Sequence, residues 1–218
     1  MHLRTIVFTT LATAAVALAQ NPITADSPYQ VRYASNLTVG DSVINISNTG
    51  ASGAGNGSGT SATVTGAICV NVYAFTPDEE FIACCSCPVT PDGLVSLSAQ
   101  RDLINNSLIP VHPTSIVVKL VSTAPTGTPA SCSNSAAAVS TAGLRAGMVA
   151  WGTTLHANTS AAAGTYAVTE TSFTPSTLSA GEVTRLNYVC GFAIGQGSGF
   201  GICNSCRLGG LGAGDSLN

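Results

Sequence analysis

Cysteines are the residues of this chain whose type and spacing could do chemistry. Three of its eight cysteines fall within CCSC, residues 84–87, and a second Cys-x-x-Cys pair, Cys203 and Cys206, follows near the C-terminus. Two such pairs can supply four thiolates to a tetrahedral zinc ion, so Cys84, Cys87, Cys203 and Cys206 are a candidate metal site. One pair alone can be a redox dithiol, and an even cysteine count in an exported chain predicts structural disulfides.

The first 19 residues decide between these alternatives. They are typical of a cleaved secretory signal, with basic His2 and Arg4, an apolar stretch and the small-x-small pattern Ala17-Leu18-Ala19. We therefore expect a secreted or cell-surface protein whose mature chain begins near Gln20 and contains no membrane span. Because thiols oxidise outside the cytosol, we favour disulfides over zinc or redox chemistry and expect no cofactor.

All eight cysteines are disulfide candidates: Cys69, Cys84, Cys85, Cys87, Cys132, Cys190, Cys203 and Cys206. Eight cysteines allow too many connectivities for the pairing to follow from the sequence. A bond between the neighbours Cys84 and Cys85 would strain the peptide that joins them. We expect the cluster at 84–87 to bond outward instead, to Cys69, to Cys190 and to the 203–206 pair.

The charge content narrows the class of partner. Charged residues make up 8% of the chain, against about 25% in ordinary soluble proteins. Seven Lys and Arg, less Arg4 of the signal, leave six against ten Asp and Glu, a net charge of −4. The chain therefore lacks the basic footprint of a nucleic-acid binder. A surface with few charges resists association weakly, which favours a homo-oligomer or polymer, or contact with a cell wall or glycan.

Period-two alternation of side chains predicts strands along most of the chain. In residues 20–49, the segments YQVRYASNLTV and SVINIS flank Gly40-Asp41 and predict an N-terminal hairpin. Residues 50–66 offer few apolar anchors and predict a Gly/Ser-rich linker. Residues 67–218 would form a disulfide-stabilised β domain. Its strands are expected within residues 67–75, 81–87, 115–122, 147–156 and 164–173.

Two helices are expected beside these strands. Residues 96–108 place leucines at helical spacing, and residues 176–195 carry a stronger pattern. There Ser179 and Glu182 fit a capping box, and Val183, Leu186 and Cys190 follow on one apolar stripe. The expected fold is therefore mainly β, an antiparallel sandwich-like domain with one or two short helices, stapled by disulfides.

Other candidate sites have weaker patterns, and we identify no catalytic residue. The acidic turn Asp78-Glu79-Glu80 could bind calcium but more often is a solvated loop. Four aromatic residues could form a face on which sugars stack, although strand aromatics are usually core: Tyr73, Phe75, Trp151 and Tyr166. Five Asn-x-Ser/Thr sequons would matter in a host that glycosylates them: Asn36, Asn45, Asn56, Asn105 and Asn158.

Two blocks of sequence carry a family resemblance. The block ICVNVYAFTPDEEFIACCSCPVTPDGLVSL, with NYVCGFAIGQGSGFGICNSC downstream, resembles a group of exported bacterial proteins that have no assigned function. The resemblance covers most of the mature chain from about Ala67. It implies a secreted protein with paired cysteine clusters and transfers no catalytic residue. A fungal hydrophobin also has eight cysteines but needs two Cys-Cys doublets, and this chain has only Cys84-Cys85.

Three hypotheses for function follow. The first is a non-enzymatic structural protein, a fibre or coat subunit, in which residues 20–48 would add a strand to a neighbouring copy. The second is an extracellular binding module, an adhesin or glycan-binding sandwich that uses an aromatic face around Trp151. The third is an exported thiol-disulfide or zinc-dependent protein that uses its Cys-x-x-Cys pairs.

Overall fold

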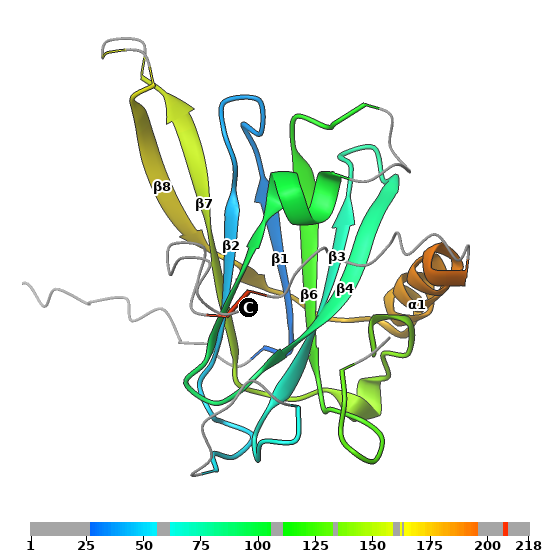
Figure 1. Cartoon of the computed structure of the whole chain (residues 1–218). Helices are drawn as coiled ribbons and strands as arrows, with labels where there is room; N and C mark the ends of the chain where they lie inside the picture. Colours follow the sequence, from blue (N-terminus) through cyan, green and yellow to red (C-terminus); the bar gives the residue numbers. More distant parts are fainter. Residues whose placement is uncertain are drawn as a thin grey trace, which may run out of the picture.

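Two antiparallel sheets face each other, and one long helix lies against the outer side of one of them (Figure 1). The computed structural model describes residues 27–55, 62–105, 111–132, 135–158, 162, 164–195 and 207–208. The predicted mainly β, sandwich-like fold is confirmed. The expected signal, residues 1–19, lies outside the described residues.

Within the described residues, each sheet has five strands, and every pairing is antiparallel. Sheet A contains, in spatial order, β4 (Phe81–Val89), β3 (Ile68–Phe75), β6 (Ile116–Thr123), β1 (Tyr29–Ala34) and β9 (Thr174–Pro175). Sheet B contains β10 (Arg207–Leu208), β5 (Leu94–Ser98), β2 (Val43–Asn48), β7 (Met148–Ala157) and β8 (Tyr166–Ser172).

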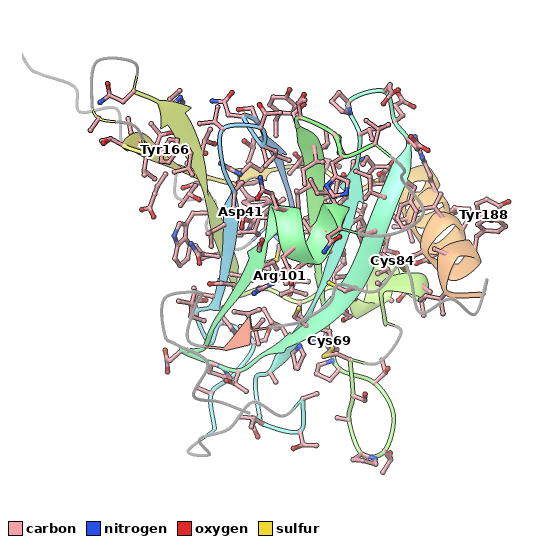
Figure 2. All side chains as sticks on the ribbon, turned by 45° about the horizontal axis from the view of Figure 1, so that its top comes forward. Asp41, Cys69, Cys84, Arg101, Tyr166 and Tyr188 are labelled. Carbon is pink, nitrogen blue, oxygen red and sulfur yellow. A yellow bond between two sulfur atoms is a disulfide. The ribbon has the colours of Figure 1, made fainter. Side chains whose placement is uncertain are left out.

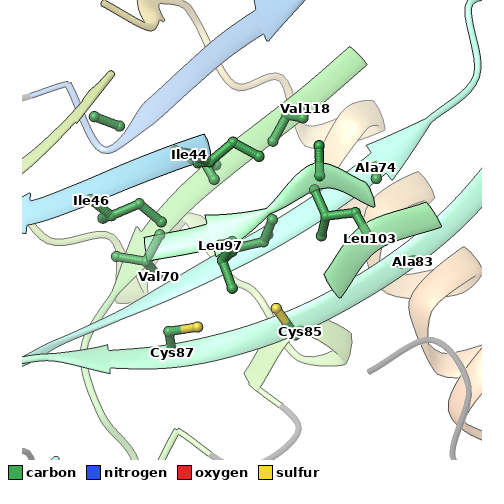
Figure 3. Close-up of a cluster of buried hydrophobic side chains, with 14 of the residues drawn as sticks. Ile44, Ile46, Val70, Ala74, Ala83, Cys85, Cys87, Leu97, Leu103 and Val118 are labelled. Atoms are coloured by element: carbon green, nitrogen blue, oxygen red, sulfur yellow. The ribbon is translucent and has the colours of Figure 1, made fainter. Parts of the chain in front are cut away.

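The main hydrophobic core lies between the sheets. Alternate residues of each strand point inward, because successive side chains of a strand point to opposite faces. Figure 3 shows how they interdigitate: Ile44 and Ile46 come from β2, Val70 from β3 and Leu97 from β5. Cys85 and Cys87 of β4 belong to the same cluster.

A second cluster lies on the outer face of sheet A, under the helix α1 (Ala180–Gly195). It includes Tyr73 and Phe75 of β3 together with Leu186 and Cys190 of α1. Because both faces of β3 are covered, all eight of its residues are buried. Three short helices complete the described elements: η1 (Ala99–Ile104), η2 (Ser135–Ala137) and η3 (Thr141–Gly143).

The predicted helix over 176–195 is confirmed as α1. The Ser179 hydroxyl accepts a hydrogen bond from the Glu182 amide (3.1 Å), as expected of an N-terminal cap. The Glu182 side chain does not complete a capping box, since it accepts from Nζ of Lys119 in β6 at 2.5 Å. This ion pair, about one-fifth exposed on each side chain, holds the start of the helix against the sheet.

The prediction of an N-terminal hairpin is wrong. β1 pairs with β6 and β9 in sheet A, whereas β2 pairs with β5 and β7 in sheet B. The chain between them crosses from one sheet to the other, and it turns at Asn36, whose φ is +60°. The Leu37 amide donates to the Thr114 carbonyl (2.9 Å), which anchors the crossing.

The described parts of the expected linker, residues 50–55 and 62–66, fold back onto the sandwich. The buried Asn48 side chain donates to the carbonyls of Gly66 and Val89, both at 2.9 Å, and accepts from the Gly50 amide. Gly66 has φ +81°, and a Cβ there would lie 1.6 Å from the Gly53 carbonyl oxygen. These contacts, together with the placement of β1 and β2, join residues 27–55 to the same sandwich as the later strands.

The expected helix over 96–108 is mostly wrong. Residues 94–98 form β5, and Leu97 packs into the core between the sheets. Within the described part of this segment, residues 96–105, only η1 is helical, and its first turn is capped by Ser98, whose hydroxyl accepts from the Arg101 amide (2.9 Å). A strand followed directly by a helical turn placed Leu97 and Leu103 at apparent helical spacing.

Candidate functional site: cysteines and the edge ribbon

The cysteines form structural disulfides. Cys84 bonds to Cys190 and so fixes α1 to β4, which confirms one predicted bond (Figure 2). Cys69 bonds to Cys132, so the predicted link from Cys69 to the 84–87 cluster is wrong. The error arose because Cys69 and Cys84 face the outer side of sheet A at separate places, each opposite a different covering segment.

The remaining cysteines of the CCSC cluster, Cys85 and Cys87, are also disulfide-bonded. Both point into the core between the sheets, away from Cys84 (Figure 3). The predicted partners, Cys203 and Cys206, lie outside the described residues, so that part of the pairing stays a prediction. Since Cys84 and Cys87 are in separate disulfides, neither is available as a thiolate ligand of zinc or as half of a Cys84–Cys87 dithiol.

The acidic turn Asp78-Glu79-Glu80 is held by hydrogen bonds of its own chain. The Thr76 amide donates to the Glu80 carbonyl (2.8 Å), and the Glu80 amide donates to the Thr76 hydroxyl (2.9 Å). The hydrogen bond from Thr76 also holds the pKa of the Asp78 carboxyl below its usual value. Within the described residues, no three His, Cys, Asp or Glu side chains come together as metal ligands.

The expected aromatic face is divided between the two sheets. Tyr73 and Phe75 are buried under α1 on sheet A, so these two are core residues, as strand aromatics usually are, and do not form a sugar-binding face. Burial raises the pKa of Tyr73, whose hydroxyl donates to the Ala136 carbonyl. Trp151 and Tyr166 both lie on sheet B, in β7 and β8, where Tyr166 is 47% exposed.

These last two residues belong to a two-stranded segment that we call the edge ribbon, residues 151–157 of β7 and Tyr166–Ser172 of β8. It projects from the body of the sandwich, and β8 forms its outer side (Figure 1). β8 pairs with β7 along all seven of its residues and is the last strand of sheet B. All seven residues of β8 are exposed.

The inward face of the edge ribbon is polar. Arg32 of β1 reaches it from sheet A and is only 6% exposed. Its Nε donates to the Thr171 hydroxyl (3.1 Å), and its Nη2 donates to the Thr154 hydroxyl (2.9 Å) and the Thr153 carbonyl (3.0 Å). A Cβ on Gly152 would lie 2.6 Å from Nη1, so this glycine makes room for the guanidinium.

These contacts have an electrostatic cost and a structural consequence. Burial lowers the pKa of Arg32, because removing the guanidinium from water disfavours its charged form. Its partners on the ribbon are neutral oxygens, which tie sheet A to both strands of the ribbon. Further out, His156 Nε2 lies 2.9 Å from the Thr169 hydroxyl.

The outward face of the edge ribbon carries its larger apolar side chains, with the polar pair Thr153 and Glu170 between them. The register pairs Trp151 with Ser172, Leu155 with Val168 and Ala157 with Tyr166, and directly paired residues share a face. Val168 is 57% exposed, and Figure 2 shows Tyr166 on the projecting ribbon. A sandwich ordinarily places apolar residues inward and polar residues outward. The edge ribbon inverts that arrangement.

The sequence patterns did not predict which face of the edge ribbon points outward. Residues 164–173 were expected to form a strand, but which of its faces is outward depends on the pairing with β7 and on Arg32. Four of the five sequon asparagines lie within the described residues, in three kinds of setting. Asn105 and Asn158 are exposed, Asn45 is half-buried in β2, and Asn36 donates to the Leu155 carbonyl (3.1 Å). Asn56 lies outside the described residues.

Comparison with known proteins gives no relative for this chain. No family model, no curated protein and no solved structure matches it. No helix in the part of the chain that the structure describes has the length and apolar character needed to span a membrane.

Proposed function

We propose that this chain is a non-enzymatic extracellular structural or surface protein that associates with copies of itself by strand addition at β8. The observation that carries the proposal is the exposure of all seven residues along this last strand of sheet B. A long open strand edge is a template for pairing with another chain. β8 contains one charged residue, Glu170, and neither Lys nor Pro, two residues with which natural edge strands discourage such pairing.

Two general properties support an extracellular structural role. Disulfides persist in oxidising compartments, and the described cysteines are all bonded. The low charge content, 8% of residues, weakens the repulsion that keeps copies of a protein apart.

The edge of β8 replaces residues 20–48 as the proposed assembly element. β1 is paired with β6 along six residues, and β2 has partners on both sides. Removing this segment would take a strand from each sheet and open the core. Strand addition at β8 leaves both sheets intact.

Two proline substitutions test the proposal as a matched pair. Successive N–H groups of an edge strand point alternately to its neighbour and to the free edge, so Val168→Pro and Thr169→Pro differ in which one they remove. The substitution that keeps the thermal stability has removed a free-edge N–H, and it should abolish self-association measured by light scattering. Association that persists in both folded variants would contradict strand addition at β8.

A second candidate function is binding to a glycan. Trp151 and the exposed Tyr166 share the outward face of the edge ribbon and are separated by about 20 Å along it. Sugar rings stack on aromatic faces, and the spacing suits an extended chain. Glycan-array binding that is lost in Trp151→Ala and retained in Tyr188→Ala, an exposed aromatic on α1, would support this function.

A further inference from the structure

We infer that the strand which adds to β8 is β8 of a second copy, antiparallel and centred on Thr169, so that the assembly closes as a dimer. This inference rests on the proposed strand addition and specifies its partner, register and symmetry.

The other edges of the two sheets are either short or buried. β9 and the described part of β10 are each two residues long, too short to offer an extended template. β4 is the long outer strand of sheet A, but Ile82, Cys84, Cys87 and Val89 are fully buried, which leaves little of its edge accessible. Among the described strands, β8 therefore has the one long open edge.

A single pairing edge determines the symmetry of the assembly. When a protein has a single pairing edge, two copies join by placing the same edge of each together, which is a two-fold interface. Such an interface uses the edge of both copies and leaves none for a third. A fibre would need a second, different edge. Of the two assemblies that the sequence suggests, a homo-oligomer or a polymer, a single edge therefore favours the closed homo-oligomer.

The charge and length of β8 determine the register in which the two copies of this strand pair. Glu170 is the only charged residue of β8, so a register centred on it would place two carboxylates directly opposite each other. Centring on Thr169 avoids that contact and is the only antiparallel register that pairs all seven residues. It places Thr169 opposite its own copy, a favourable Thr–Thr pair, and Val168 opposite Glu170 of the second copy.

The same register accounts for the exposed tyrosine on the outward face. Ser172 lies beside Trp151 in the pairing of β7 with β8. Across the interface, Ser172 would face Tyr166 of the second copy. That tyrosine would then lie on the same row as Trp151, two strand spacings or about 10 Å away. The dimer would therefore surround a side chain that one copy leaves 47% exposed.

Single-cysteine substitutions at consecutive positions test the register. In the inferred dimer, Thr169→Cys lies about 5 Å from its own counterpart between Cα atoms, within reach of a disulfide. Val168→Cys and Glu170→Cys are displaced from theirs to about 7 to 8 Å, beyond easy reach. All three positions are exposed, and thermal melts under reducing conditions check that each variant folds. We expect Thr169→Cys to give the highest yield of disulfide-linked dimer on non-reducing gels.

The outcomes separate this inference from the proposed function. The highest yield at Val168→Cys or Glu170→Cys would overturn the register. No cross-linking at any of the three, in a protein whose association still responds to proline in β8, would show that a different strand adds there. Species larger than a dimer would overturn the two-fold closure. A wild-type protein that is monomeric at every concentration would refute the proposed function itself.

Discussion

Removing the disulfide between Cys84 and Cys190 should detach α1 from the sandwich. The double substitution Cys84→Ala and Cys190→Ala leaves no new thiol to exchange with Cys85. Alanine suits the site better than serine, since both cysteines are fully buried in the apolar cluster under the helix. Serine would leave a hydroxyl there without a partner.

The expected loss of stability follows from the length of chain that each bond closes. Cys84 and Cys190 are 106 residues apart, and Cys69 and Cys132 are 63 apart. In the chain-entropy model these loops correspond to about 4.8 and about 4.3 kcal/mol. The two double variants should therefore lose similar free energies of unfolding, which makes Cys69→Ala with Cys132→Ala a matched control.

The two variants should differ in which part of the structure loses its protection from hydrogen exchange. Without Cys84–Cys190, α1 keeps the Lys119–Glu182 ion pair and the hydrogen bonds between Asn187 and Val139, but it loses its covalent tie. Amide hydrogen exchange measured by mass spectrometry should then speed up in α1 while β3 and β6 stay protected. The control variant should keep α1 protected relative to its own sandwich. Equal exchange of α1 in both variants, or no loss of stability in either, would refute this reasoning.

Three further predictions concern the sandwich. Asn48→Ala should lower the free energy of unfolding by about 2–4 kcal/mol, because the carbonyls of Gly66 and Val89 lose the hydrogen bonds that Asn48 donates. Urea denaturation would measure this loss, and a loss below about 1 kcal/mol would contradict the prediction. Ser122→Ala should raise stability by about 1 kcal/mol, since the buried Ser122 hydroxyl has no hydrogen-bond partner in the described structure; a lower melting temperature would contradict this. Burial first, and the Glu182 charge second, raise the pKa of Tyr29 from 10.0 to about 12. The folded state then holds a proton that the unfolded state releases, so this contribution to stability is full below pH 10 and is lost as the pH rises to about 12. Urea midpoints measured across that range should fall, less so in Tyr29→Phe.

Local signals in the sequence predicted the fold class and α1. The helix formed where the Ser179 cap and the apolar stripe through Leu186 and Cys190 coincided, because one local pattern and one tertiary contact favoured the same structure. The prediction of a helix over 96–108 was wrong because Leu97 is part of a strand and packs into the core between the sheets. Strand propensity and helix spacing are indistinguishable over so short a segment.

Pairing between distant segments was not predictable. The Gly40-Asp41 signal suited a hairpin, but the strands on either side of it pair with other strands, in opposite sheets. The edge ribbon depends on a still longer-range relation. Its inverted faces follow from Arg32 of β1, which lies more than 100 residues before the threonines it binds in β7 and β8. No local periodicity in the sequence indicates the contact of Arg32 with these threonines.

Self-association through β8 can be measured by hydrogen exchange at different protein concentrations. The protein would be exchanged at one concentration where it is associated and at one where it is dissociated. We expect association to slow the exchange of amides within residues 166–172, while peptides of β1 and β2 exchange equally at both concentrations. Protection that appears elsewhere, or no change in β8 upon association, would contradict it.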